Sequence, residues 1–439
     1  MRFLFLFLFP ASLFAQQNLS LDEAIRLAVD NSFQIMIAQR NLDIAQNNND
    51  WAVAGRYPTV TLGATNGNTY TNSKSPTGFL TTLSVYGTGV TPFAEANWTF
   101  YNGMRTRFTK EQLETLVDLN EGQVRTQIET VVSQTIRAYY NALIQREQVG
   151  VFSDVLALSR DRIEYQEIRK EYGQAGSFDI IQTTDAYLND STSYLIQLNT
   201  YENALRNLNL AMGVDADNID YTLTTDLEYT APDYDRNALR ERLLQNNVSL
   251  QNLFVSRELA LINTQLQEST LKPTLGLSAG VAYDYQIQDG SGISANGMDF
   301  PIDGAVNKRF NGFINLTAAY TLYDGGVRRI NIENARSEEL IAQLNVDDLR
   351  RNLLISLNNT LATYRNQKRL LELTENLVAN ARRNIDISEE RFRAGQINSF
   401  DYRTVQLQYI NAVQARLNAI FNIRTTETEL LRLIGDLVR

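Results

Sequence analysis

The chain carries the same pattern twice, and this duplication constrains its fold more than any other feature of the sequence. Pro58 aligns with Pro273 at a spacing of 215 residues, and Gly103 aligns with Gly325 at a spacing of 222. The larger spacing then persists through the rest of the chain without a gap. The extra residues of the second half therefore lie between these two anchor points, where we expect a surface loop because loops tolerate insertions.

Each half is expected to run helix, strand, loop, strand, very long helix, tight turn and helix. Proline is absent from 93–231 and from 302–439, as long helices require, because a proline inside a helix costs about 3 kcal/mol. At 1.5 Å per residue the helices of the first half extend roughly 52, 100 and 50 Å. The two shorter helices can therefore stack end to end along the long one. We expect helices over about 20–54, 104–170 and 178–211 in a first repeat (16–213), and over about 237–271, 326–392 and 400–433 in a second repeat (237–439), with a linker or equatorial segment over 214–236.

Hydrophobic residues recur every seven positions along the second long helix. The series is Leu357, Tyr364, Leu371, Val378, Ile385 and Phe392, and the returning helix carries Val405, Tyr409, Ala412, Ala419 and Ile423 at compatible spacings. A strict seven-residue repeat favours left-handed coiled-coil pairing. An ordinary amphipathic helix is the alternative interpretation of the same stripe.

Four segments alternate between apolar residues and small or polar ones, with the period of a β-strand. We expect strands over about 57–66, 90–101, 273–285 and 311–323, and polar loops over about 66–89 and 286–309, which are rich in Gly, Ser, Thr, Asn and Asp. The apolar faces carry Val60, Leu62, Ala64, Val90, Ala94, Ala96, Trp98 and Phe100 in the first half, and Leu275, Leu277, Ala279, Val281, Tyr283, Tyr285, Ile314, Leu316, Ala318, Tyr320 and Leu322 in the second.

Alternation of this kind also describes a water-soluble sheet, but such a sheet does not explain four strands set between such long helices. Four strands are too few to close a transmembrane barrel, which needs at least about eight. An open sheet edge in lipid leaves backbone groups unpaired. The strands must then pair between subunits, and a dimer, trimer or tetramer would give 8, 12 or 16 strands.

The composition excludes several classes of chemistry. The chain contains no His and no Cys, which rules out Ser–His–Asp and Cys–His catalysis, zinc fingers and thiolate metal sites. Its net charge of −10 argues against general binding to nucleic acid. Enzymes that use two carboxylates and metal sites built only from carboxylates remain possible, although nothing marks out such a pair, and we expect no cofactor.

The N-terminus has the pattern of a secretory signal peptide, which we expect over residues 1–15. Arg2 precedes the apolar run Phe3–Phe9, and the small residues of Ala11–Ala15 offer a cleavage site before Gln16. The apolar run is far shorter than the ~20 residues of a membrane-spanning helix. The chain is thus expected to be exported, with any membrane role performed by its β-strands.

Together these patterns resemble the TolC family of outer-membrane efflux and secretion channels, over essentially all of residues 16–439. The motifs that carry the resemblance are Leu19–Ile25, the strand entries Tyr57–Pro58 and Lys272–Pro273, Leu322–Gly326 at a strand-to-helix junction, and Arg391–Gly395 at a helical tip. Because the chain lacks an N-terminal Cys, it resembles the non-lipidated branch.

The resemblance implies a mainly α fold with membrane β-structure. Three chains would form a twelve-stranded β-barrel in the outer membrane, four strands from each, and a coiled α-helical barrel across the periplasm. It also implies contact with outer-membrane lipid, a periplasmic adaptor (membrane fusion protein) and an inner-membrane transporter as partners. The expected function is passive exit through the channel of a tripartite efflux pump or type I secretion system, without enzymatic activity.

Two tight turns join the long and the returning helices. Glycine can end a helix in the left-handed conformation, Ser can cap the next helix, and an Asp in its first turn suits the helix dipole. By resemblance, these tips are also where the adaptor docks. The turns are Gly173, Gln174, Ala175, Gly176 and Ser177 in the first half, and Gly395, Gln396, Ile397, Asn398 and Ser399 in the second.

Asp401 follows the second tip and matches the first of two aspartates that, in the family, ring the periplasmic constriction. The second aspartate position is Thr404 here, and the family's latch-forming tyrosine and arginine positions are Phe392 and Ile397. A ring of Asp401 side chains would concentrate negative charge on the axis and attract cations. The alternative interpretation is that Asp401 is only a first-turn acid that favours its helix.

The junctions between strand and long helix are interpreted as structural, although Asp-Gly-Gly also resembles a ligand loop. Glycine supplies unusual backbone angles there, and Asn102 and Asp324 can cap the following helices. The residues concerned are Asn102, Gly103, Asp324, Gly325 and Gly326.

Two other functional classes remain as alternatives. An exported structural coiled-coil scaffold explains the helices but not the strand pairs that recur in both halves. An exported carboxylate enzyme, as in glycosidases, needs a pocket that long heptad helices do not provide. Dependence on detergent separates the channel from both, and turnover of a glycan would support the enzyme.

Overall fold

The computed structural model describes residues 17–74, 80–215, 221–295 and 298–438. The chain forms two compact units. The helical unit comprises Met1–Leu42, Asn120–Leu253 and Asn345–Arg439, and the strand unit comprises Asp43–Leu119 and Phe254–Leu344. Each unit thus draws equivalent segments from both halves of the duplication.

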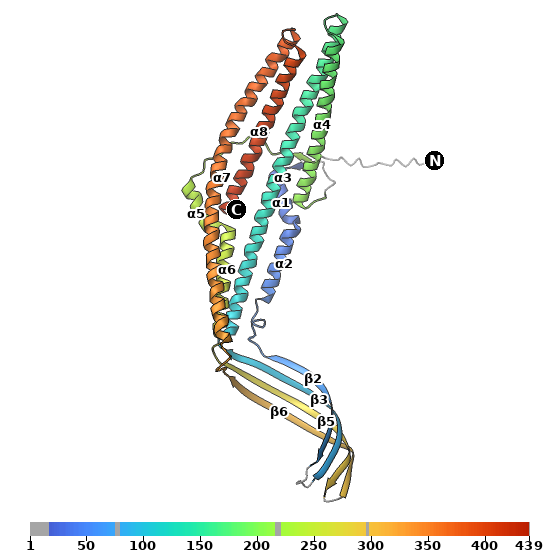
Figure 1. The fold of residues 1–439 in the computed structure, drawn as a ribbon, viewed down its shortest axis with the longest axis vertical. Coiled ribbons are helices and arrows are strands. Elements are labelled where there is room, and N and C mark those ends of the chain that lie inside the picture. The colour runs from blue at the N-terminus through green and yellow to red at the C-terminus, as the bar shows by residue number, and fades with distance from the viewer. Residues whose placement is uncertain (1–16, 75–79, 216–220, 296–297, 439) are drawn as a thin grey trace, which may run out of the picture. The chain divides into compact units, whose positions relative to one another are not determined.

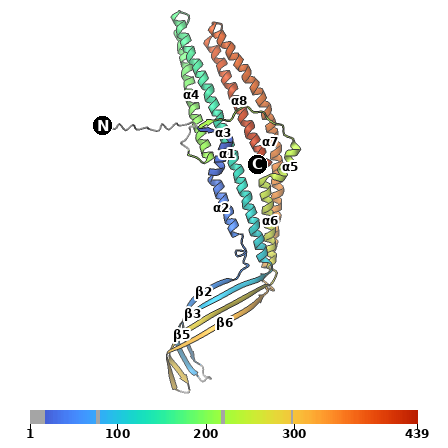
Figure 2. The same cartoon turned by 180° about the vertical axis from the view of Figure 1, so that it is seen from behind.

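The strand unit contains an antiparallel sheet in the order β2-β3-β5-β6 (Figures 1 and 2). Each half contributes one hairpin, and the two hairpins join between β3 and β5. Within the described residues, β2 and β6 are therefore open edges. The strands are β2 (Thr59–Lys74), β3 (Leu80–Asn102), β5 (Thr274–Ala295) and β6 (Met298–Ala319).

The prediction of loops over 66–89 and 286–309 is wrong for most of their described residues, because the strands continue through these segments. Cross-strand polar pairs replace the apolar face in this part of the sheet. Tyr70 lies opposite Tyr86, its hydroxyl is 3.2 Å from Ser84 Oγ, and Thr88 Oγ1 donates to Asn68 Oδ1 at 2.7 Å. Such pairs stabilise a sheet without the apolar alternation from which the strand ends were predicted.

The part of the sheet that contains the start of β2 and the end of β6 keeps the two unlike faces that the alternation predicts. Val60, Leu62, Ile314 and Leu316 lie on one face and are 70–79% exposed. The opposite face carries mostly small and polar residues. A large apolar face left open to the surroundings marks a surface that another phase or chain covers.

The helices pair as the seven-residue pattern predicts. The stripe along α7 is buried at Leu357, Tyr364, Leu371, Ile385 and Phe392, and α7 lies beside α8 as α3 lies beside α4 (Figures 1 and 2). Within the described residues, no helix combines the length and the apolar character needed to cross a membrane. The helices are α1 (Leu21–Asn31), α2 (Phe33–Asn48), α3 (Arg105–Glu171), α4 (Ser177–Met212), α5 (Arg236–Asn246), α6 (Val248–Ser269), α7 (Val327–Arg393) and α8 (Ser399–Leu433).

The two shorter helices expected over 20–54 and 237–271 are each interrupted, at Ser32 and at Asn247, where the backbone is extended. Asn247 donates from Nδ2 to Leu433 O at 3.0 Å and accepts from the N–H of Leu250 at 2.9 Å. One side chain thus caps α6 and joins it to the end of α8. The equivalent break at Ser32 lies next to Gly213, after the end of α4.

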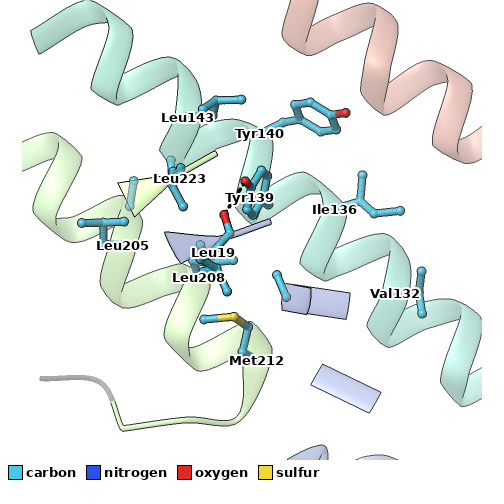
Figure 3. Packing of buried hydrophobic residues seen from close by; sticks show 13 residues of the cluster. Leu19, Val132, Ile136, Tyr139, Tyr140, Leu143, Leu205, Leu208, Met212 and Leu223 are labelled. Carbon is cyan, nitrogen blue, oxygen red and sulfur yellow. Dashed lines mark hydrogen bonds between the residues drawn. The ribbon is translucent and has the colours of Figure 1, made fainter. Parts of the chain in front are cut away.

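A buried cluster around Tyr139 holds the segment that contains Leu19 in the helical unit (Figure 3). The strand β1 (Gln17–Leu19) pairs in parallel with β4 (Tyr221–Leu223), so the expected linker contains a strand. The Tyr139 hydroxyl donates to Leu19 O at 2.8 Å. Leu19, Leu208, Met212 and Leu223 pack around this fully buried ring.

Candidate functional site

The two helical tips have the connection chemistry that the sequence predicts. Gly173 and Gly395 both adopt φ of 71°, the left-handed conformation that favours glycine. The N–H of Gly395 donates to Phe392 O at 3.0 Å, and the N–H of Gln396 donates to Arg391 O at 2.8 Å. These bonds satisfy carbonyls that the end of α7 leaves free.

The expectation that Ser177 and Ser399 cap the returning helices is wrong, since each is the first residue of its helix. The caps are Gly176 and Asn398. Asn398 Oδ1 accepts from the N–H groups of Phe400 and Asp401 at 2.9 and 2.8 Å. Asparagine is as good a capping residue as serine and stands one position closer to the turn.

Asp401 lies exposed on the first turn of α8, and Thr404 lies exposed on the second. The Thr404 hydroxyl donates to Phe400 O at 3.0 Å, so its hydrogen bond stays on its own helix. The Asp401 backbone is held by the Asn398 cap, which leaves its carboxylate at the surface beside the second tip. Asp401 is therefore available to a gate, and it also satisfies the helix-dipole interpretation.

Phe392 contributes to packing within the chain. Its ring stacks on Tyr402 at a centroid distance of 5.2 Å and tilts against Tyr165 at 5.3 Å. Ile397, which is half-buried, packs against the same cluster. A groove of about 330 Å³ adjoins these rings and is also lined by Arg162. Within one chain, the four residues predicted for the gate thus divide into two buried or half-buried apolar groups and two exposed polar groups.

A buried polar cluster within a few turns of the tips was not predicted. Asp190 on α4 accepts two hydrogen bonds from Arg403 on α8, at 2.7 and 2.5 Å, and a third from Ser159 on α3. Beside this pair, Arg162 donates to Gln406 Oε1 at 3.2 Å, and burial lowers the pKa of Arg162. The Asp190 carboxylate, bonded to Arg403 and Ser159, therefore ties three helices together.

A signal for this cluster exists in the sequence. Polar residues occupy core positions of the α3/α4 pair near its tip, where the seven-residue pattern normally places apolar ones. These polar residues recur at spacings of three and four on α3 and of seven on α4, and a search for polar residues at such spacings would have identified them. They are Ser159, Arg162 and Gln166 on α3, and Thr183, Asp190 and Gln197 on α4, all of them buried.

The two junctions between strand and long helix have the capping side chains and the unusual backbone angles that the sequence predicts. Asn102 Oδ1 accepts from the N–H of Thr106 at 3.1 Å at the start of α3. Gly103 and Met104 both have positive φ, of 69° and 76°, as do Gly325 and Gly326, at 72° and 88°. Met104 thus adopts, at the equivalent position of the first half, a conformation for which the second half uses glycine.

Asp324 caps α7 at the second junction. Its carboxylate accepts from the N–H groups of Gly326 and Arg328, both at 3.0 Å, and from Arg328 Nε at 2.8 Å. The backbone N–H of Arg328, followed by its guanidinium, holds the pKa of Asp324 below its ordinary value. Arg328 also donates to Thr321 O at 2.6 Å, which fixes the chain between β6 and α7.

Replacing Asp324 with Asn should make the free energy of unfolding less dependent on pH in the acid range. A carboxylate whose pKa is lowered by folding adds its full stability above its unfolded pKa of about 4, and this is lost as the pH falls through the folded pKa. We expect Asp324→Asn to have a lower urea midpoint than the wild type at pH 7 and an equal one in strong acid. Asp118→Asn, an exposed change on α3, is the control. If the urea midpoints of Asp324→Asn and the wild type differed by the same amount at every pH, the charged cap at Asp324 would be contradicted.

Among the described residues, no group of three or more acidic side chains is arranged to hold a metal ion. The features described above consist of helix caps, a packed aromatic cluster, a buried ion pair and an exposed acid at the second tip.

Comparison with known proteins identifies the family. A family model described as outer membrane efflux protein matches residues 24–214 and 239–436, one match in each half of the chain. The chain belongs to the outer membrane efflux protein family. This result confirms the duplication and the resemblance that the sequence motifs indicated.

Solved structures confirm the fold of this efflux-family chain. The CmeC outer membrane channel of Campylobacter jejuni matches with a TM-score of 0.74 at 15% identity, over 95% of this chain and 86% of that one. The outer membrane protein VceC of Vibrio cholerae matches with a TM-score of 0.74 at 16% identity, over 94% and 96%. The open state of the MtrE outer membrane channel of Neisseria gonorrhoeae matches with a TM-score of 0.70 at 14% identity, over 95% and 89%. A search of curated proteins found no significant match.

Proposed function

We propose that this chain forms, as a homotrimer, the outer-membrane channel of a tripartite efflux pump or type I secretion system. The observation that carries the proposal is the open four-stranded sheet of the strand unit, which has one exposed apolar face and two unpaired edges. Unpaired strand edges are costly in lipid, and three copies joined edge to edge give twelve strands. The apolar face then meets the outer-membrane lipid, and the polar face lines a water-filled pore.

The helices complete the proposed channel on the periplasmic side. Each chain contributes two long hairpins, and their seven-residue stripes suit side-by-side packing into a helical barrel. We assign the two tips to the periplasmic adaptor, which links the channel to an inner-membrane transporter. The structural neighbours named as outer membrane channels, CmeC and MtrE, support this assignment through their shared fold. Transport through such a channel is passive and needs neither covalent chemistry nor a cofactor.

Within this channel we assign Asp401 to the periplasmic constriction. Its carboxylate is exposed beside the second tip, and a threefold ring of such groups attracts cations and repels anions. Asp179 is the equivalent acid of the first hairpin, but it accepts from the N–H of Gly176 at 2.9 Å and serves its own turn. The two hairpins therefore offer a matched pair of acids with different expected roles.

The test is the mass of the purified mature chain in detergent, followed by single-channel current in a planar bilayer. We expect a trimer with a cation-selective conductance. The Asp401→Asn variant should lose selectivity severalfold, because three charges leave the narrowest part of the pore, whereas Asp179→Asn should keep it. Equal selectivity in both variants sinks the gate assignment and retains the channel. A detergent-independent species without current overturns the channel in favour of an exported coiled-coil scaffold.

A further inference from the structure

Two phenylalanine rings lie on the otherwise small and polar face of the sheet, each against a glycine. Phe93 lies directly opposite Gly63 on β2, and Phe313 lies directly opposite Gly280 on β5. A Cβ added to Gly63 would lie 2.6 Å from Phe93 Cζ, and one added to Gly280 would lie 2.8 Å from Phe313 Cζ. The rings therefore occupy the space that larger residues would fill, which is a common reason for glycine inside a strand.

Glu95 adjoins both rings on the same face. It lies directly opposite Gly280 on the β5 side, and Phe313 reaches over that glycine from the next strand. Phe93 is two residues earlier on β3, so its side chain projects to the same face. Asn97 Nδ2 donates to Glu95 Oε1 at 3.0 Å and helps to orient the carboxylate. A negative charge thus stands beside two aromatic side chains, one of which, Phe313, is 41% exposed.

The second acid of this face, Asp284, has different surroundings. Its carboxylate accepts from Thr91 Oγ1 at 2.8 Å and from Asn311 Nδ2 at 2.7 Å, and Arg309 lies opposite it on β6. The cross-strand neighbours of Glu95, Thr61 and Gly280, are both uncharged. Both carboxylates accept hydrogen bonds, but Asp284 has a cation directly opposite it, whereas Glu95 has uncharged cross-strand neighbours and lies near the Phe313 ring.

We propose that Glu95, Phe93 and Phe313 form a binding subsite for lipophilic monovalent cations, such as ammonium or phosphonium ions with aromatic substituents. The inference rests on the proposed function, because it places the polar face of the sheet in the pore. The cation is attracted by the carboxylate and by the ring faces, while its apolar groups lie against the phenylalanines. A contact of this kind on an open, wet surface is weak, as passage through a pore requires.

The test is block of the single-channel current by tetraphenylphosphonium, with tetramethylammonium as a cation of equal charge that lacks aromatic groups. We expect tetraphenylphosphonium to reduce the wild-type current at concentrations where tetramethylammonium does not. In Glu95→Gln and in Phe313→Leu, the concentration for half block should rise roughly three- to tenfold, as for loss of one partly exposed cation contact. Asp284→Asn removes the same charge from the same face and should leave the block unchanged.

The outcomes are distinct. Equal weakening in Glu95→Gln and Asp284→Asn would show a general effect of pore charge and overturn the subsite. Block that neither Glu95→Gln nor Phe313→Leu alters would also overturn it, while the current itself would still support the channel. Absence of current from the wild-type protein overturns the proposed function and with it the pore-facing subsite. Current recorded without the blocker shows which variants assemble into a channel. Because Glu95 and Phe313 lie on different strands, one variant can still test the subsite if the other fails to assemble.

Discussion

Replacing Asp190 with Asn should lower the free energy of unfolding by about 3 kcal/mol, because the Arg403 guanidinium loses its buried carboxylate partner. Removing one partner of a buried ion pair typically costs 3–5 kcal/mol. The lower end applies here because the Arg403 side chain keeps 20% of its surface exposed, whereas that of Asp190 keeps 5%. Asn preserves the shape of the side chain, so the loss reports charge and not a cavity.

The measurement is the urea midpoint of unfolding in detergent at neutral pH, recorded through the helical circular dichroism signal. Glu389→Gln is the matched control, because it breaks an ion pair with Arg393 whose side chain is 67% exposed. Exposed pairs contribute at most about 1 kcal/mol. If the two variants lose the same stability, the Asp190 pair does not have the buried environment described for it.

Replacing Gly435 with Ala should cost about 2–5 kcal/mol, as the sum of two effects. The residue has φ of 71°, and an L-residue in the left-handed conformation costs about 1–2 kcal/mol. An added Cβ would also lie 2.3 Å from Asn246 O, a backbone atom at the break between α5 and α6. Backbone there must move, and overpacking of this kind costs about 1–3 kcal/mol more.

Gly395→Ala separates the two effects, because Gly395 has the same φ of 71° and open space where its Cβ would be. We expect this control to lose only the conformational part, about 1–2 kcal/mol. Thermal unfolding of both variants and the wild type gives the comparison. Equal losses would mean that the end of α8 does not press on the break, and that the close approach is absent in solution.

The sequence predicts the large elements of this fold because their causes are local and repeated. The seven-residue stripe from Leu357 to Phe392 requires only that a partner helix be present. The absence of proline and the aligned glycines set the helix ends within a few residues. The junction caps Asn102 and Asp324 were predicted for the same reason, since a capping side chain acts on N–H groups within four residues of its own position.

The features that were missed depend on contacts between distant parts of the chain. The breaks at Ser32 and Asn247 are set by the ends of α4 and α8, which lie far away in sequence. The pairing of β1 with β4 involves two strands of three residues, too short for any alternation to be seen. The Asp190 cluster was missed because polar residues at core positions weaken the very pattern from which a core is predicted.

The edges of the sheet have a consequence for how this protein reaches its final state. In the proposed trimer, the rows of backbone donors and acceptors along β2 and β6, which a single chain leaves unpaired within the described sheet, are paired by neighbouring chains. The last step of folding is then an encounter, and its rate depends on protein concentration as well as on the chain itself. Until that encounter takes place, the same edges are open to any other extended strand, so timely assembly also protects the chain from aggregation.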